Sequence, residues 1–268
     1  MYKLLKLNDF RQFKNMNILL GKNITVLAGR NSTGKSTILG VLANSGELKK
    51  KDGTTYSNRR FRAEFSEIFH GSKKYDASGS DRIQIDIVDE NDNIIDYRKF
   101  RTAWQNEKGK DRFRVIPIKF LDGGKKTEAK MQIPVSYLGL SRLFPIGEAN
   151  EEKIVKNKIN FMDDKQKNWF IEQYKQILSL YDTVTDISNY SIGETDKKKG
   201  VGIETDKYDY LTNSSGQDNL GQILMAILSF KRLKLQREDW TGGLLLIDEI
   251  DATLHPAAQK RLIDLLIK

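Results

Sequence analysis

The sequence predicts an α/β fold with a central, mostly parallel sheet, an antiparallel β meander and an insertion made of helix and hairpin. Two apolar runs support the sheet: ITVLAG at 24–29 is β-branched, and LLLIDE at 244–249 fits a strand buried on both faces. Alternating apolar and polar residues recur from 82 to 139, which is typical of antiparallel strands. Helical periodicity marks residues 35–43, 147–181 and about 218–234.

The elements follow in order along the chain. Residues 1–28 predict two or three strands, because YKLLKLNDF alternates, MNILLGKN ends in a Gly turn and ITVLAG is apolar. Residues 44–80 are irregular and basic. The helical stretch at 147–181 ends in DKQKNWFIEQYKQILSLY, and residues 183–211 predict a hairpin around DKKKG. One face of that helix is expected to carry Trp169, Phe170, Tyr174, Ile177 and Leu178.

Composition excludes several classes of protein. The chain has 268 residues, 38% of them hydrophobic, which is enough for a packed core. The absence of cysteine excludes disulfides, thiol catalysis and cysteine metal sites. Apolar runs fall far short of the ~20 residues of a membrane span, and lysines interrupt the N-terminus MYKLLKLNDF, so we expect a cytoplasmic protein with no membrane partner and no signal peptide.

A glycine-rich loop predicts a phosphate site. GRNSTGKST matches G-x-x-x-x-G-K-[ST] between a predicted strand and a predicted helix, a context in which backbone N–H groups bind phosphate oxygens. Lys35 would reach the β- and γ-phosphates of ATP, and the Ser36 hydroxyl would ligate Mg²⁺. The predicted cofactor-binding residues are Gly29, Arg30, Asn31, Ser32, Thr33, Gly34, Lys35, Ser36 and Thr37.

Two carboxylates follow the run LLLI. At the carboxyl end of a strand they are expected beside the phosphate loop, where α/β sheets place ligands. Asp248 would hold Mg²⁺, and Glu249 would activate the attacking water as general base. The alternative is an acid-rich helix start, since Asp248, Glu249 and Asp251 precede ATLHPAAQKRLIDLLI.

A third block, NSSGQ at 213–217, leads into a predicted helix. Its candidate residues are Ser214, Ser215, Gly216 and Gln217. Hydroxyls, a glycine and the positive end of a helix suit contact with a phosphate. Ordinary capping, with Asp218 or Ser215 as N-cap, is the alternative, and both roles can hold together.

The order GRNSTGKST, SSGQ, LLLIDEIDATLHP resembles the ABC superfamily of ATPases. The opening LNDFRQFKNMNILLGKNITVLAGRNSTGKST and the block DEIDATLHP are similar to the RecF/SMC/OLD-like branch, and YLGLSRLFP to defence-associated ATPases of the Septu PtuA type. The resemblance implies one ATPase head over 1–268: a P-loop lobe with the meander (1–145), an insertion (146–212) and a signature and Walker B part (213–268).

The resemblance also implies how the head works. NSSGQ corresponds to the signature motif, which contacts the γ-phosphate held by another head, so a homodimer or higher homo-oligomer is expected. Two expected hydrolysis elements have no clear match: Ser141 and Arg142 stand where a Q-loop glutamine is expected, and His255 comes too early for a switch histidine. Because the last helix ends without a cap, we expect a truncated C-terminus.

Two function classes remain. One is an ATPase acting on DNA in anti-phage defence or genome maintenance; the other is a regulatory ATP-binding module that controls a partner such as a nuclease. The net charge of +9 allows a nucleic-acid partner without requiring one. Basic residues that could hold nucleic-acid phosphates, or simply be solvated, are Lys49–Lys51, Arg59, Arg60, Arg62 and Lys197–Lys199.

Overall fold

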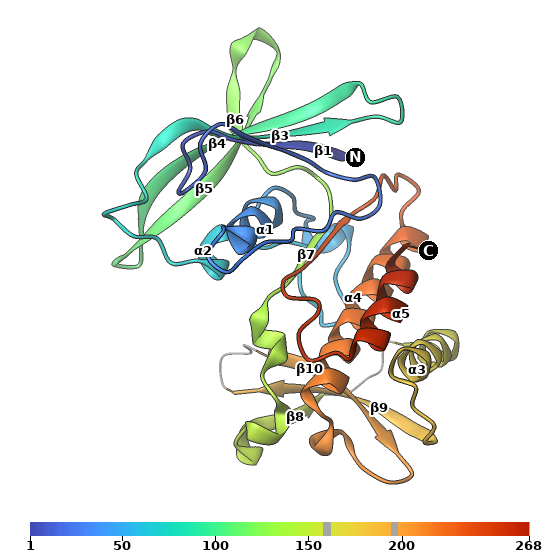
Figure 1. Ribbon diagram of the computed structural model, residues 1–268. Helices are drawn as coiled ribbons and strands as arrows, with labels where there is room; N and C mark the ends of the chain where they lie inside the picture. Colours follow the sequence, from blue (N-terminus) through green and yellow to red (C-terminus); the bar gives the residue numbers. More distant parts are fainter. Residues whose placement is uncertain (158–161, 194–197, 268) are drawn as a thin grey trace. The chain divides into compact units, whose positions relative to one another are not determined.

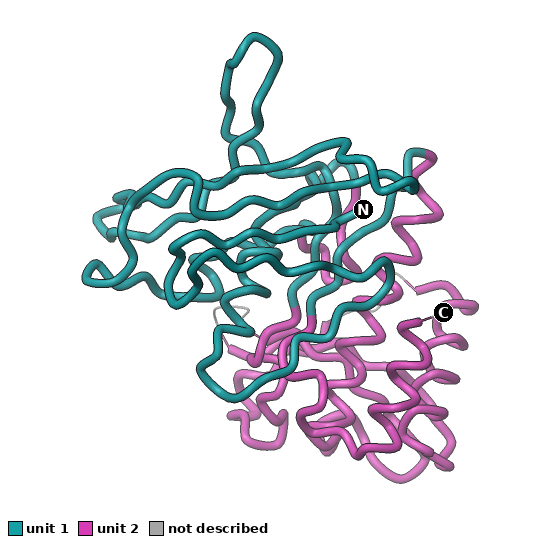
Figure 2. Tube along the Cα trace, turned by 45° about the horizontal axis from the view of Figure 1, so that its top comes forward, with its two compact units in different colours: residues 1–52, 60–137, 239–246 teal, residues 53–59, 138–238, 247–268 magenta. Residues whose placement is uncertain are grey.

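The computed structural model describes residues 1–157, 162–193 and 198–267. The chain divides into two compact units (Figure 2). Unit 1 contains residues 1–52, 60–137 and 239–246, and unit 2 contains residues 53–59, 138–238 and 247–268. Helices and strands are mixed in both, which confirms the predicted α/β class. The expected central, mostly parallel sheet is wrong: among the described residues, the six- and three-stranded sheets are both antiparallel.

A six-stranded antiparallel sheet forms the frame of unit 1, in the order β2-β1-β3-β4-β5-β6 (Figure 1). Its strands are β1 (Tyr2–Leu7), β2 (Met16–Leu19), β3 (Gly79–Val88), β4 (Ile94–Glu107), β5 (Lys110–Phe120) and β6 (Lys126–Glu128). Strands β3, β4 and β5 pair as consecutive hairpins, with Phe100 opposite both Ile83 and Pro117. The predicted meander is therefore confirmed.

Two helices, α1 (Lys35–Ala43) and α2 (Phe65–Ile68), lie on one face of this sheet (Figure 1). Alternate residues of the strands point into the core, so Ile83, Ile85 and Phe100 are buried. Phe65 of α2 packs edge-on against Phe113 of β5. The sheet and α1 therefore share one hydrophobic core, and α1 opens directly after the phosphate loop.

A short parallel pair joins β7 (Val135–Leu138) to β11 (Leu244–Ile247). The amide of Leu244 donates to Pro134 O at 2.9 Å and the amide of Asp248 to Leu138 O at 3.0 Å, so both strands advance in the same direction. The predicted strand LLLI is confirmed, and it ends immediately before the acid pair.

Unit 2 combines a three-stranded antiparallel sheet, β10-β9-β8, with three helices (Figure 1). These elements are β8 (Ile154–Asn157), β9 (Val184–Ile192), β10 (Lys198–Thr205), α3 (Asp164–Leu178), α4 (Ser215–Gln236) and α5 (Pro256–Ile267). The hairpin predicted over 183–211 is confirmed in β9 and β10, but the turn expected at DKKKG is wrong in part, because Lys198–Gly200 already pair with β9. Residues 194–197 lie outside the described residues. Short 3-10 turns occupy Lys50–Asp52, Asp122–Gly124, Leu140–Leu143, Ile146–Glu148, Glu151–Lys153 and Tyr210–Thr212.

The helix predicted over 147–181 is wrong in its first half, since α3 begins only at Asp164. β-branched Ile154 and Val155 belong instead to β8, which pairs with β9. The second half behaves as expected: Phe170, Tyr174 and Ile177 are buried against the core of unit 2. In the described part of the chain, no helix is both long enough and apolar enough to span a bilayer.

Candidate functional site

The phosphate loop of unit 1 has the conformation that its glycines predict. Gly34 is the N-cap of α1 at φ 91°, ψ 13°, a left-handed conformation that disfavours other residues. A Cβ at this position would also overlap the Phe13 ring. The Thr33 hydroxyl donates to Arg30 O at 2.8 Å and tightens the loop. The loop thus leads into α1 with the first-turn amides of the helix, which have no acceptor within the helix, facing its N-terminal end.

Lys35 lies folded over this loop. Its ammonium donates to the carbonyls of Gly29 at 2.8 Å and Arg30 at 2.9 Å. Ser36 is half-buried in the first turn of α1, and Thr37 is buried behind it. Hydrogen bonds from an ammonium to phosphate oxygens are stronger than those to neutral carbonyls, so a phosphate would compete well for Lys35.

The strand expected before the loop, ITVLA, is absent: residues 24–28 belong to no strand, and Val26 is 74% exposed. The chain turns there, with the Gly21 amide donating to Thr25 Oγ1 at 2.8 Å. The turn folds the carbonyl of Ile24 back over Gly21. Local β propensity alone does not form a strand without neighbours on which to pack.

The acid pair lies in a tight turn of unit 2. Asp248 is only 5% exposed, whereas Glu249 is exposed. The backbone of Glu249 is left-handed at φ 48°, and its carbonyl accepts from the Ala252 amide at 3.1 Å. An acid-rich helix start, the alternative, does not occur here, because α5 begins only at Pro256. His255 precedes that helix, and its Nδ1 accepts from the Ala257 amide at 3.2 Å, as an N-cap would.

A buried arginine that the sequence motifs do not assign holds this turn. Arg142 donates to the carbonyls of Asp248 and Glu249 and, through Nε, to Asn219 Oδ1 at 2.9 Å. Where the Q-loop glutamine was expected, the side chain of Arg142 instead donates to the backbone carbonyls of the acid turn. Spacing in the sequence gives no signal for this contact, because Arg142 and Asp248 are 106 residues apart.

Residues 214–217 cap their own helix, and the capping residue is Ser214, not Asp218 or Ser215 as expected. Ser214 and Gln217 form a reciprocal capping box: the Gln217 amide donates to Ser214 Oγ at 3.3 Å and the Ser214 amide to Gln217 Oε1 at 2.9 Å. Gly216 meets a specific steric need, since a Cβ there would lie 2.5 Å from Thr253 O. The loop is therefore packed against the segment that follows the acid pair.

Asp218, which directly follows this loop, is buried in an ionic cluster. Its carboxylate pairs with Lys198 and accepts from the Tyr190 hydroxyl at 2.5 Å. Burial raises the pKa of Asp218, although Lys198 and Tyr190 act in the opposite direction. Burial, followed by the neighbouring Asp218 carboxylate, also raises the pKa of Tyr190. The expectation that Lys198 could hold nucleic acid is wrong because its ammonium is buried; Lys197 lies outside the described residues.

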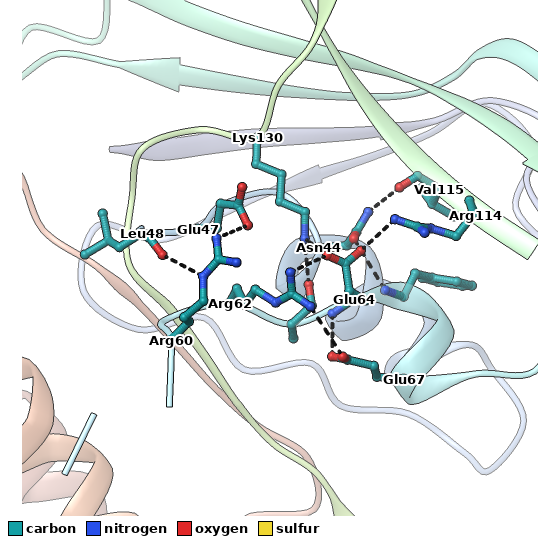
Figure 3. Close-up of polar contacts among 12 residues, drawn as sticks. Asn44, Glu47, Leu48, Arg60, Arg62, Glu64, Glu67, Arg114, Val115 and Lys130 are labelled. Atoms are coloured by element: carbon teal, nitrogen blue, oxygen red, sulfur yellow. Dashed lines mark hydrogen bonds and ion pairs between the residues drawn. The ribbon is translucent and has the colours of Figure 1, made fainter. Parts of the chain in front are cut away.

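Two of the other basic residues expected to hold phosphates are paired with acids in unit 1. Figure 3 shows Glu64 facing Lys130, Arg62 and Arg114. Its carboxylate oxygens lie 2.9, 3.5 and 3.4 Å from the nearest nitrogens of these three side chains, in that order. Arg60 pairs with Glu47 at 3.2 Å. Burial lowers the pKa of Lys130, and Glu64 opposes that change. Of the remaining members, Arg59 and Lys49–Lys51 are exposed.

An open groove of about 560 Å³ lies beside the capping loop in unit 2. Ser214, Gly216 and Gln217 line it together with Thr253 and residues of α3 and α5. The structure therefore brings the 214–217 loop and the segment after the acid pair to one depression of the surface.

Comparison with known proteins identifies the family. The profile of the family described as "AAA ATPase domain" matches residues 1–223, which include the phosphate loop and residues 214–217. No curated protein matches the chain. A solved structure described as "Structure of the recombination mediator protein RecF-ATP in RecFOR pathway" is 12% identical, with a TM-score of 0.43 over 99% of this chain and 89% of that chain. Because the family profile covers most of the sequence, the chain belongs to the AAA ATPase domain family.

Proposed function

We propose that the chain binds ATP with Mg²⁺ through residues 29–37 and hydrolyses it. The observation that carries this proposal is the complete G-x-x-x-x-G-K-S loop, with Gly34 in the left-handed region at the start of α1 and the Lys35 ammonium resting on loop carbonyls. Backbone amides would bind the phosphates, Lys35 would neutralise the β- and γ-phosphates, and Ser36 would contribute its hydroxyl to Mg²⁺.

Asp248 and Glu249 are proposed as the acidic half of the chemistry. Asp248 would hold the metal, directly or through water, and Glu249 would take a proton from the attacking water. Their different environments support these roles, since Asp248 is buried at the end of β11 whereas Glu249 is an exposed residue on a turn with φ 48°.

Residues 214–217 are proposed to act in trans, on the nucleotide of a second copy. Helix capping uses the Ser214 hydroxyl oxygen as an acceptor. Because Ser214, Gly216 and Gln217 also line an open groove, capping is compatible with contact to a phosphate of another copy. Each copy would give its loop and receive one, which requires a two-fold symmetric homodimer or a higher assembly with the same contact. Residues 1–268 would then form one ATPase head, divided near 145 and 212.

For the biological setting, we favour an ATP-driven cytoplasmic switch in DNA-related anti-phage defence or genome maintenance. The alternative is a regulatory module that holds and controls a partner such as a nuclease. One observation favours the alternative: several cations expected to hold nucleic acid, Arg60, Arg62 and Lys198, are paired with acids of the chain itself. Salt-dependent binding of duplex DNA would support the first role, and its absence the second.

Nucleotide binding is tested by Lys35→Ala, with Lys22→Ala as the matched control. Both variants remove one lysine, but Lys22 is exposed and lies seven residues before the loop motif. Lys35→Ala is expected to weaken Mg–ATP binding at least tenfold in calorimetry while far-UV circular dichroism is unchanged. Equal affinity of Lys35→Ala and the parent would disprove the site.

The trans contact is tested by Ser215→Arg, with Thr212→Arg as control. Both place an arginine near the start of α4, but only Ser215 belongs to the proposed loop. Light scattering with ATP is expected to show dimers of the parent and of Thr212→Arg, and monomers of Ser215→Arg that still bind ATP. Equal dimerisation of all three would leave the loop with a capping role only.

A further inference from the structure

Arg142 is the most deeply buried arginine among the described residues, with 2% of its surface exposed. It lies in the 3-10 turn Leu140–Leu143, directly after β7. A buried guanidinium without hydrogen-bond partners would destabilise the fold. The partners of Arg142 therefore indicate its role.

Those hydrogen bonds converge on the acid turn. Nη2 donates to Asp248 O at 2.5 Å and to Glu249 O at 2.9 Å. Nη1 donates to Leu138 O at 2.9 Å and Gly139 O at 3.0 Å, which fixes the guanidinium to the end of β7. Arg142 thus holds the acid turn through the backbone carbonyls of both acids.

The same guanidinium reaches the helix that follows the capping loop. Its Nε donates to Oδ1 of Asn219, a fully buried residue of α4. Asn219 in turn donates through Nδ2 to Ala252 O at 3.1 Å and Thr253 Oγ1 at 3.2 Å. Arg142 and Asn219 therefore clamp the segment 248–253 from both ends and connect it to α4.

The clamp acts on a backbone that is unfavourable by itself. Glu249 has φ 48° and Thr253 has φ 65°, conformations that non-glycine residues adopt only when their surroundings hold them. A planar guanidinium can donate to several fixed carbonyls at once, whereas the ammonium of a lysine is a single point on a flexible chain. Arginine therefore fits this set of five acceptors better than lysine.

We propose that Arg142 is a positioning residue for hydrolysis: it fixes the Asp248–Glu249 turn and links its geometry to the start of α4. This proposal rests on the proposed role of Glu249 as general base. It places no requirement on ATP binding by residues 29–37. The expected effect of a substitution is a lower kcat with an unchanged KM, because a misplaced base slows the chemical step without weakening the binding of ATP.

The test is a double-mutant cycle between Arg142→Lys and Glu249→Gln, measured in single-turnover ATP hydrolysis by the full chain. Arg142→Lys alone is expected to lower the rate tenfold or more, with ATP affinity within threefold of the parent. In the Glu249→Gln background its effect on the residual rate should be at least threefold smaller than in the parent, because the base is already gone and only the position of Asp248 is still affected.

Arg98→Lys is the matched control. Arg98 is 3% exposed and also donates to a backbone carbonyl, Ala129 O at 3.0 Å, but it lies on β4 of the six-stranded sheet. Arg98→Lys should lower the thermal midpoint as Arg142→Lys does, but should leave kcat within twofold of the parent. Hydrogen exchange should become faster at residues 248–253 in Arg142→Lys only.

Three results would overturn the proposal: an unchanged rate in Arg142→Lys, a tenfold further loss in the Glu249→Gln background, or an equal loss of kcat in Arg98→Lys. A parent-like rate of Glu249→Gln alone would instead overturn the role of Glu249. If Arg142→Lys does not fold, Asn219→Ala removes the other end of the clamp. That variant should show the same loss of kcat at constant KM, and a parent-like kcat would overturn the proposal.

Discussion

The buried ion pair between Lys198 and Asp218 allows a quantitative prediction for Lys198→Met. Methionine fills most of the volume of the lysine stem but leaves the carboxylate of Asp218, which is fully buried, without its cation. Breaking one side of a buried pair costs about 3–5 kcal/mol. Tyr190 still donates to Asp218, so we expect the lower end, about 3 kcal/mol. At an m-value of about 2 kcal/mol/M, the urea midpoint of unit 2 should fall by roughly 1.5 M.

The loss should also depend on pH. Burial raises the pKa of Asp218 in the folded state above the unfolded value of 3.8. An acid of this kind stabilises the protein most below its unfolded pKa, and stability falls as pH rises from the unfolded toward the folded value. Without Lys198, the folded pKa rises further and the fall extends to higher pH. The destabilisation by Lys198→Met should therefore be larger at pH 7 than near pH 4.

Urea titrations of the parent, Lys198→Met and Lys260→Met at both pH values test this reasoning. Lys260 and Asp264 form an exposed pair, so removal of Lys260 should change the free energy of unfolding by less than about 0.5 kcal/mol. A loss in Lys198→Met that is equally small, or that grows toward low pH, would refute the assignment of a buried charged pair.

Three further changes test the packing and capping around the proposed site. Gly221→Ala should lower the thermal midpoint by about 2–4 °C although alanine favours helix, because its Cβ would overlap Val201 O; a higher midpoint would contradict this packing. Ser214→Ala should cost about 1 kcal/mol of stability in chemical denaturation through loss of the capping box, and no loss would contradict the capping role. Gly34→Ala should weaken ATP binding at least tenfold in calorimetry, because it must adopt φ 91° and displace Phe13; unchanged affinity would contradict the loop geometry.

Features encoded in short stretches of sequence could be predicted. The phosphate loop, the meander and the buried face of α3 depend on local spacing and periodicity, and the structure has all three. The strand ITVLA could not be predicted correctly, because a turn at Gly21 and the lack of a ladder decide its conformation. Ile154 and Val155 were expected in a helix for a related reason: their partners in β9, Ile192 and Ser191, come 38 and 36 residues later (192 − 154 and 191 − 155).

The contacts that organise the acid turn lie beyond what local patterns reveal. Arg142 reaches Asp248 across 106 residues and Asn219 across 77. From the sequence, Lys198 is indistinguishable from a solvated hairpin lysine. In the structure, its ammonium pairs with Asp218 and donates to the carbonyl of Phe144. In each case, the charge is visible in the sequence and its partner is not, because tertiary structure alone decides which charges are buried together.

We propose that Glu249 is the general base of ATP hydrolysis by this chain, and Glu249→Gln separates that chemical step from ATP binding. Glutamine keeps the size of the side chain and loses its basicity. With ATP binding measured by calorimetry and phosphate release measured on the same preparation, we predict unchanged affinity and a turnover lower by ~10²-fold or more. Phosphate release by Glu249→Gln at the parent rate would contradict the account.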